Sequence, residues 1–451
     1  MGMDTSVVYS SRASLALVGL HCQQMNLWST VRQFVQIKQK VHQHDPLDKL
    51  LDCFINILAG GHGLNEINLR VRPDLALQAA FGRGQCAEQS TISRTLNACT
   101  EATVAQFRQA HDVLLRQYGR SYQHDYDQQP QLWDVDLTGL IAGRLGEGVT
   151  KGYFAHHKNA RGRQLGRVLA TYYDELLVDQ LYPGRQQLYQ GLPTLIQQAE
   201  RTLNLSEKQR ENTIVRIDGG GGTDLAIDWL LRRQYHILIK VKSWQRAQKL
   251  AASVTDWVPD TKVADRALGW VTEPHAYQRP TRQLAIRTPK AKGGYHYQLI
   301  ICTLPDPLLF ALGQLPLPAS PSSAEVLRAS MHAYDQRDGG LETHNRGDKQ
   351  GLGLNHRNKQ LFAAQEILIL LAQLAHNFLI WTRHALAQED ERFRAFGLQR
   401  LVRDVLQIDG VVALTPGGLI QHLSLNQRHP LAAAVQQALL TDDLLANLRK
   451  I

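Results

Sequence analysis

Residues 133–138 read Trp-Asp-Val-Asp-Leu-Thr, with apolar and polar side chains in strict alternation. A period of two residues is typical of a β-strand, whose side chains point alternately to the two faces of a sheet. This stretch therefore predicts a strand with one apolar face and one face that carries Asp134 and Asp136. These two carboxylates on one strand face are candidate catalytic or metal-binding residues.

The chain beyond this strand alternates between strand and helix patterns. The predicted elements are strands over 133–138, 166–173 and 175–182, a helix over 192–203, a strand over 213–217, a helix from Thr223 or Asp224 to Arg233, and a strand over 235–241. This order is that of the ribonuclease-H-like fold, an α/β fold with a mixed sheet whose first and fourth strands lie side by side. We therefore expect Asp136 and Asp218, at the ends of those two strands, to face each other.

Four glycines, 219–222, follow Asp218. A backbone without Cβ atoms would let a nucleic acid strand come close to the carboxylates, although the same glycines would also make an ordinary tight turn. The chain contains no P-loop, because the required Gly-Lys-Ser/Thr is missing.

The composition is typical of a folded protein with more basic than acidic residues. Its length of 451 residues corresponds to about three domains. Its 43% share of hydrophobic residues is enough for a buried core and excludes wholesale disorder. The most apolar stretch, 367–381, is interrupted by polar side chains, so no membrane span is expected. The five cysteines form no CxxC pair and favour reduced core thiols over a zinc site. No signal peptide is recognised, so we expect a cytoplasmic, nucleoid-associated protein.

The net charge of +9 is compatible with a polyanionic partner, and its placement matters more than its size. Leu75–Phe81, the turn Gly82-Arg83-Gly84 and a second helix capped by Ser90 form a pattern typical of a helix-turn-helix. Arg94 would lie on the outer face of the second helix and contact DNA. The alternative is an ordinary helical hairpin.

A β-rich insertion is predicted over 250–325. Its hairpin would pair 283–287 with 295–303, and five basic residues without an acid lie between Arg279 and Lys292. A long helix is expected from Asn355 to Leu386, and a short strand pair near 411–423. The predicted domains are a helical DNA-binding domain (1–125), the two parts of the catalytic core (126–249 and 326–386), the insertion (250–325) and a C-terminal region (387–451).

Residues 334–349 read Tyr-Asp-Gln-Arg-Asp-Gly-Gly-Leu-Glu-Thr-His-Asn-Arg-Gly-Asp-Lys, which contains the pattern Tyr-x2-Arg-x4-Glu-x6-Lys. Together with Asp136, Asp218 and the basic insertion, this pattern resembles the DDE transposases of bacterial insertion sequences. More narrowly, it resembles the cut-and-paste group with a Tyr-Arg-Glu-Lys signature and a β insertion before the last acid. The resemblance extends from about residue 85 to about residue 385.

The resemblance implies a catalytic, metal-binding triad of Asp136, Asp218 and Glu342. Such a triad holds two Mg²⁺ ions, for which Mn²⁺ can substitute, and cleaves and transfers DNA strands. The implied partners are double-stranded DNA, as the element's terminal inverted repeats and as the target, and a second copy of the chain in a homodimer on DNA.

The same resemblance implies that Tyr334, Arg337 and Lys349 bind DNA phosphates. A planar guanidinium and an ammonium suit phosphate oxygens, and a phenol can donate a further hydrogen bond. If Glu342 begins a helix, Lys349 returns to the same face seven residues later.

Two assignments remain open in the sequence. The gap between Arg337 and Glu342 is one residue longer than the family's usual gap, so Asp338 is the alternative third acid. Asp134 and Asp136 share a strand face, and we prefer Asp136 because it precedes Leu-Thr, as the family's first acid often precedes a hydroxyl residue.

Two other functions fit part of the sequence. Asp134-Val-Asp-Leu-Thr matches the DxDxT motif of haloacid-dehalogenase-like phosphatases, in which Asp134 would be the covalent nucleophile and Asp136 the general acid. The chain could also be a catalytically inactive descendant of a transposase that only binds DNA.

Overall fold

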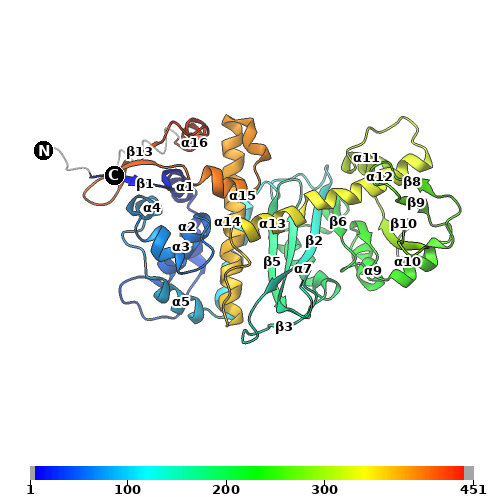
Figure 1. Cartoon of the computed structure of the whole chain (residues 1–451), viewed down its shortest axis with the longest axis horizontal. Coiled ribbons are helices and arrows are strands. Elements are labelled where there is room, and N and C mark those ends of the chain that lie inside the picture. The colour runs from blue at the N-terminus through cyan, green and yellow to red at the C-terminus, as the bar shows by residue number, and fades with distance from the viewer. Residues whose placement is uncertain (1–5, 156, 441–451) are drawn as a thin grey trace. The chain divides into compact units, whose positions relative to one another are not determined.

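The computed structural model describes residues 6–155 and 157–440, and these residues fold as two compact units. The helical unit combines residues 6–119, 140–150 and 344–440, and the sheet unit combines 120–139 and 151–343. Figure 1 shows the helices of the first unit and the strands of the second. Strand β2 and helix α13 each run from one unit into the other.

The helical unit is built from α1 (Ala13–Gln24), α2 (Leu27–Phe34), α3 (Pro46–Leu58), α4 (Leu75–Ala80), α5 (Gln89–Ala98), α6 (Glu101–Tyr118), α14 (Phe362–Glu389), α15 (Leu398–Arg400) and α16 (Ala432–Leu439). Short helical turns at Ile67–Val71, Glu391–Ala395 and Leu401–Val405 connect some of them. A sheet of β1 (Ser6–Ser10), β12 (Gly410–Leu414) and β13 (Ile420–Leu425) pairs the beginning of the chain with its last part. The predicted strand pair near 411–423 is confirmed, whereas β1 was not expected.

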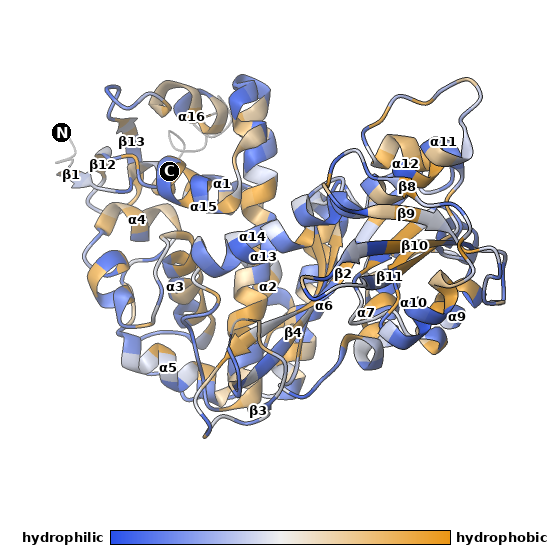
Figure 2. Cartoon of the chain, turned by 45° about the vertical axis from the view of Figure 1, so that its right-hand side comes forward, coloured by the Kyte–Doolittle hydropathy of each residue, from blue (hydrophilic) through white to orange (hydrophobic). Residues whose placement is uncertain are grey.

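Helix α14 is the core of this unit. It contacts α3, α5, α6 and α16, and Figure 2 shows hydrophobic segments along its ribbon. It is long and apolar enough to cross a membrane, but 94% of its most apolar window is buried inside the structure, as is typical of a core helix. The prediction that this helix begins at Asn355 is wrong. It begins at Phe362, where Glu147 Oε2 accepts a hydrogen bond from the first helical amide.

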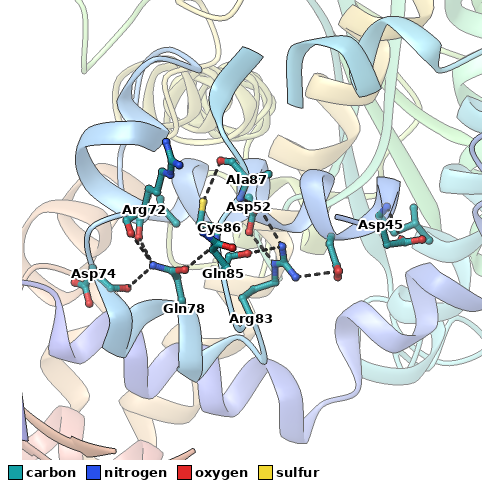
Figure 3. A network of polar contacts seen from close by, with 12 residues as sticks. Asp45, Asp52, Arg72, Asp74, Gln78, Arg83, Gln85, Cys86 and Ala87 are labelled. Carbon is teal, nitrogen blue, oxygen red and sulfur yellow. Dashed lines mark hydrogen bonds and ion pairs between the residues drawn. The ribbon is translucent and has the colours of Figure 1, made fainter. Parts of the chain in front are cut away.

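A buried polar network holds the connection between α4 and α5 (Figure 3). The Arg83 guanidinium, 8% exposed, donates from Nε to Asp52 Oδ1 (2.9 Å) and from Nη2 to the Gln85 carbonyl (2.9 Å). Asp52 Oδ2 also accepts from the Ala87 amide at 2.8 Å. The two predicted helices are present, but Ser90 does not cap the second one, because it lies inside α5. Helix α5 follows Glu88, whose carboxylate accepts the Ser90 hydroxyl instead.

The sheet unit contains β2 (Gln131–Ile141), β3 (Thr150–Lys151), β4 (Arg161–Ala170), β5 (Glu175–Pro183), β6 (Thr213–Ile217), β7 (His236–Lys240), β8 (Val258–Pro259), β9 (Ala267–Trp270), β10 (Arg282–Pro289) and β11 (Tyr295–Cys302). Its helices are α7 (Leu188–Leu203), α8 (Glu207–Arg210), α9 (Asp224–Arg232), α10 (Trp244–Ala251), α11 (Asp306–Leu312) and α12 (Ser323–Asp335). A 3-10 turn at Gln336–Gly339 leads from α12 to α13 (Leu341–Gln350).

The ten strands form one mixed sheet in the order β3-β4-β2-β6-β7-β11-β10-β9-β8, with β5 paired to β4. Strands β2 and β6 are parallel neighbours, so the predicted adjacency of the first and fourth strands of the core is observed. The predicted hairpin of the β insertion is also present as β10 and β11. These strands continue the main sheet, because Ile300–Cys302 of β11 pair with Leu238–Lys240 of β7.

The Arg83 network gives a test of what stabilises the α4–α5 connection. Arg83→Met would leave Asp52, which is 0% exposed, without its cation, so we expect the helical unit to lose about 3–5 kcal/mol of unfolding free energy. Urea titration followed by hydrogen exchange of peptides from α3 to α5 measures this loss.

The matched control is Arg32→Met. Arg32 also forms ion pairs with acids of this region, Asp45 and Asp48, but its side chain is 40% exposed, so its loss should cost less than about 1 kcal/mol. Equal effects of the two substitutions would contradict the assigned role of Arg83.

Candidate active site

The parallel register of β2 and β6 places the first two predicted acids side by side. Val135 of β2 pairs with Ile217 of β6, and the next residue on each side is Asp136 and Asp218. Neighbouring strands lie roughly 4.8 Å apart, and residues in one register row point to the same face. The two carboxylates therefore lie side by side. Asp218 directly follows the last residue of β6, but β2 continues to Ile141, so the predicted position of Asp136 at a strand end is wrong.

One row earlier, the same register forms a buried ion pair. Asp134 faces Arg216, whose Nε and Nη2 donate to the two carboxylate oxygens at 2.6 and 2.8 Å. Thr171 donates a further hydrogen bond to Asp134 Oδ2 at 3.0 Å. Asp134 is 0% exposed, which disfavours its use as the covalent nucleophile of a phosphatase. Asp134 is therefore a buried residue whose carboxylate is held by Arg216 and Thr171.

Arg216 also fixes the segment that precedes α13. Its Nη1 donates to the Ala333 carbonyl of α12 at 2.9 Å. Gly340 lies against the ion pair so closely that a Cβ at this position would overlap Asp134 Oδ2. The next residue, Leu341, is buried with Leu169 of β4 in a small apolar cluster. These contacts hold the start of α13 beside β2.

Asp136 has one cationic partner and an acidic neighbour. Arg337 Nη2 donates to Asp136 Oδ2 at 2.8 Å. Burial raises the pKa of Asp136 to about 7, and the charge of Asp218 adds to the rise while Arg337 opposes it. Arg337 was predicted to bind DNA phosphates, and in this structure it neutralises the first acid. Its Nε is buried and has no hydrogen-bond partner among the described residues.

The glycines after Asp218 shape the turn that carries this acid. The Gly220 amide donates to Asp218 Oδ1 at 2.8 Å, and the Lys242 amide donates to the Gly222 carbonyl at 2.9 Å. A Cβ at Gly222 would overlap the Lys240 carbonyl. At least this glycine is therefore required by close packing against β7. The helix that follows, α9, is capped by Thr223, whose hydroxyl accepts from the Ala226 amide.

Lys240 extends the row of charges across a third strand. Ile217 of β6 pairs with Ile239 of β7, so Lys240 follows in the row of Asp218. Burial lowers the pKa of Lys240, and the nearby charge of Asp218 counteracts this effect. The sequence analysis missed Arg216 because it searched for acids. The spacing of 82 residues that separates Arg216 from Asp134 also separates Asp218 from Asp136, and this repeated spacing was the available signal.

The other predicted residues lie on three helices. Tyr334, on α12, is close enough for Arg337 and Asp218 to influence its pKa, which burial raises. Glu342 is exposed in the first turn of α13, and Lys349 is half-buried near the end of the same helix. Arg94 is exposed on α5 of the helical unit.

Asp136 and Asp218 fit a divalent cation in part. Two adjacent carboxylates provide oxygen ligands of the kind that divalent cations prefer. No group of three acidic, His or Cys side chains positioned for a metal ion occurs among residues 6–155 and 157–440. The structure therefore brings two of the three predicted acids together and leaves Glu342 apart from them.

The different roles of Asp134 and Asp136 can be tested by stability. Asp134→Asn would leave the buried Arg216 guanidinium without a carboxylate and should lower the unfolding free energy by about 3–5 kcal/mol. Asp136→Asn should change it little at pH 6, where a carboxyl with a pKa of about 7 is mostly protonated. Urea unfolding of both variants at pH 6 measures the difference. A comparable loss in both would mean that Asp136 is also a structural residue.

Comparisons with known proteins place the chain in a family. No curated protein matches it. Among solved structures, it is similar to the piggyBac transposase in a cryo-EM structure of the synaptic complex with hairpin DNA. That similarity covers 98% of this chain and 84% of the other, with 11% sequence identity and a TM-score of 0.47. The family model for the transposase DDE domain, group 1, matches residues 7–443. The chain therefore belongs to the group 1 family of transposase DDE domains.

Proposed function

We propose that this protein is the transposase of an insertion element and that it cleaves and joins DNA at the element's terminal repeats. The observation that carries the proposal is the lateral pairing of Asp136 with Asp218, on two adjacent parallel strands in a chain of this family. The sheet order around these strands supports a ribonuclease-H-like core.

Asp136 and Asp218 would hold Mg²⁺ or Mn²⁺ together with a third acid. When bound, two such ions lower the pKa of an attacking water and stabilise the leaving oxygen of a phosphodiester. Arg337 would neutralise Asp136 in the free protein and turn its guanidinium to a phosphate oxygen when DNA is bound. Its buried Nε without a partner supports this second use of the side chain.

Glu342 is the proposed third acid. Gly340 and Leu341 hold the beginning of α13 beside β2, and Glu342 is the next residue. The extra residue between Arg337 and Glu342 is taken up where the 3-10 turn ends at Gly340, whose φ of −88° and ψ of −125° are not helical. This bend supports the signature assignment over the alternative, Asp338, which is exposed on the 3-10 turn.

DNA recognition is proposed for the helical unit. Helices α4 and α5 with the buried Arg83 between them would form a helix-turn-helix that presents Arg94 to the major groove. Tyr334 and Lys349 would bind phosphates near the cleavage site. Because transposition needs two element ends at once, we propose a homodimer on DNA.

Cleavage of the element's own end tests the function. Purified protein with Mn²⁺ should nick, or convert to a hairpin, a labelled duplex that carries the terminal inverted repeat flanking this gene. Asp218→Ala should lower the rate by at least about 10²-fold, because removing a carboxylate ligand should cost several kcal/mol of transition-state stabilisation.

The outcomes separate the remaining functions. Repeat-specific binding without cleavage by the unaltered protein would favour an inactive DNA-binding descendant. Phosphatase activity that depends on Asp134, without DNA cleavage, would favour the haloacid-dehalogenase-like alternative.

The third acid is assigned by comparing two isosteric variants in the same assay. Glu342→Gln should abolish cleavage while repeat binding, measured in Ca²⁺, stays within about twofold, because the lost group would be a metal ligand and not a DNA contact. Asp338→Asn is the matched control on the preceding turn and should retain cleavage. The reverse result would assign the third acid to Asp338.

A further inference from the structure

A cavity of about 360 Å³ opens in the helical unit, and neither Asp136 nor Asp218 lines it. Residues 142–146 line it together with Asn358, Lys359 and Gln360. Arg144 and Lys359 are the charged residues of the lining, which contains no carboxylate. The charged groups of the lining are therefore cationic only.

Several hydrogen-bond donors in this cavity have no acceptor within the described chain. Among residues 6–155 and 157–440, the exposed Arg144 guanidinium has no ion-pair partner, and the Asn358 side chain forms no hydrogen bond. The backbone amides of Arg144 and Leu145 likewise donate to no described residue. Amides and a guanidinium on residues that line one cavity provide the kind of donors that anion sites use.

The acid on this loop is directed elsewhere. Glu147 Oε2 accepts from the Phe362 amide at 2.6 Å, at the start of α14, and Glu147 is not part of the cavity lining. Its amide donates to the Gln360 carbonyl at 2.8 Å, which fixes the loop against residues 358–360. These two hydrogen bonds hold the loop of residues 142–147 in place, and the Glu147 carboxylate is not part of the cavity lining.

The cavity is connected to the proposed recognition helix. Lys359 Nζ donates to the Ser93 hydroxyl of α5 at 2.6 Å, and Arg94 is the next residue on that helix. A lining residue of the cavity is therefore in direct contact with α5.

We propose that this cavity binds a backbone phosphate of the duplex that α5 contacts, with Arg144 as its principal ligand. The inference rests on the proposed function and adds a contact to it that does not depend on base sequence. Binding through phosphate releases counterions, so the contact has a measurable salt dependence.

The test uses the full chain without divalent metal, so that no DNA is cleaved. Fluorescence anisotropy gives the Kd for the terminal-repeat duplex and for a scrambled duplex between about 50 and about 200 mM salt. Arg144→Gln should reduce the slope of log K against log salt by about 0.9 and weaken binding to both duplexes by the same factor. Arg144→Lys should restore the slope, because the charge is retained.

Arg394→Gln is the matched control. Arg394 is also an exposed arginine of the helical unit, but it is paired with Glu391 at 3.3 Å and does not line the cavity. Its replacement should leave the slope unchanged.

Three results would overturn the inference. An unchanged slope in Arg144→Gln would show that no phosphate contact was lost. Loss of the preference for the repeat at constant slope would show that Arg144 reads a base. Stabilisation of the unaltered protein, but not of Arg144→Gln, by inorganic phosphate at constant ionic strength, together with an unchanged slope, would show that the cavity takes a free anion.

The proposed function would be rejected by different measurements from those that reject the cavity. Equal affinity for repeat and scrambled duplexes, together with no cleavage in Mn²⁺, would reject the transposase. The salt slope on either duplex would still test the cavity, and an absence of DNA binding would reject both.

Discussion

The ion pair between Asp134 and Arg216 organises the candidate active site. It joins β2 to β6 inside the sheet, and Arg216 extends it to α12 through the Ala333 carbonyl. Gly340 then packs directly on Asp134, so the start of α13 is set by the same pair. A buried ion pair is weak evidence for stability, because desolvation offsets its attraction. The pair matters here because it fixes positions: this one interaction holds β2, β6, α12 and the start of α13 in place around the signature residues.

Two adjacent register rows show how partners give the same residue type different properties. Asp134 accepts both donors of a buried guanidinium and a threonine hydroxyl, so its hydrogen-bonding capacity is largely used. Asp136 accepts from Arg337 and has the negative charge of Asp218 beside it. The first arrangement favours a fixed structural carboxylate, and the second favours an exchangeable ligand.

Local sequence patterns predicted the elements that depend on local signals. The strand through Asp136, the hairpin around Asp174 and the strand that leads to Asp218 follow from alternation and turn residues, and all three are observed. The beginnings of α5 and α14 were misplaced, because Glu88 and the distant Glu147 occupy the helix starts. The position of Glu342 relative to the other acids depends on tertiary contacts around Gly340 and could not be read from spacing alone.

The β2–β6 register also limits how this protein can change over evolution. Side chains alternate between the faces of a sheet, so the loss or gain of one residue before Asp136 would turn it to the opposite face from Asp218. The same slip would separate Asp134 from Arg216 and bury two unpaired charges. Single-residue insertions and deletions should therefore be excluded from these two strands in functional descendants, while the loops that connect them remain free to vary in length.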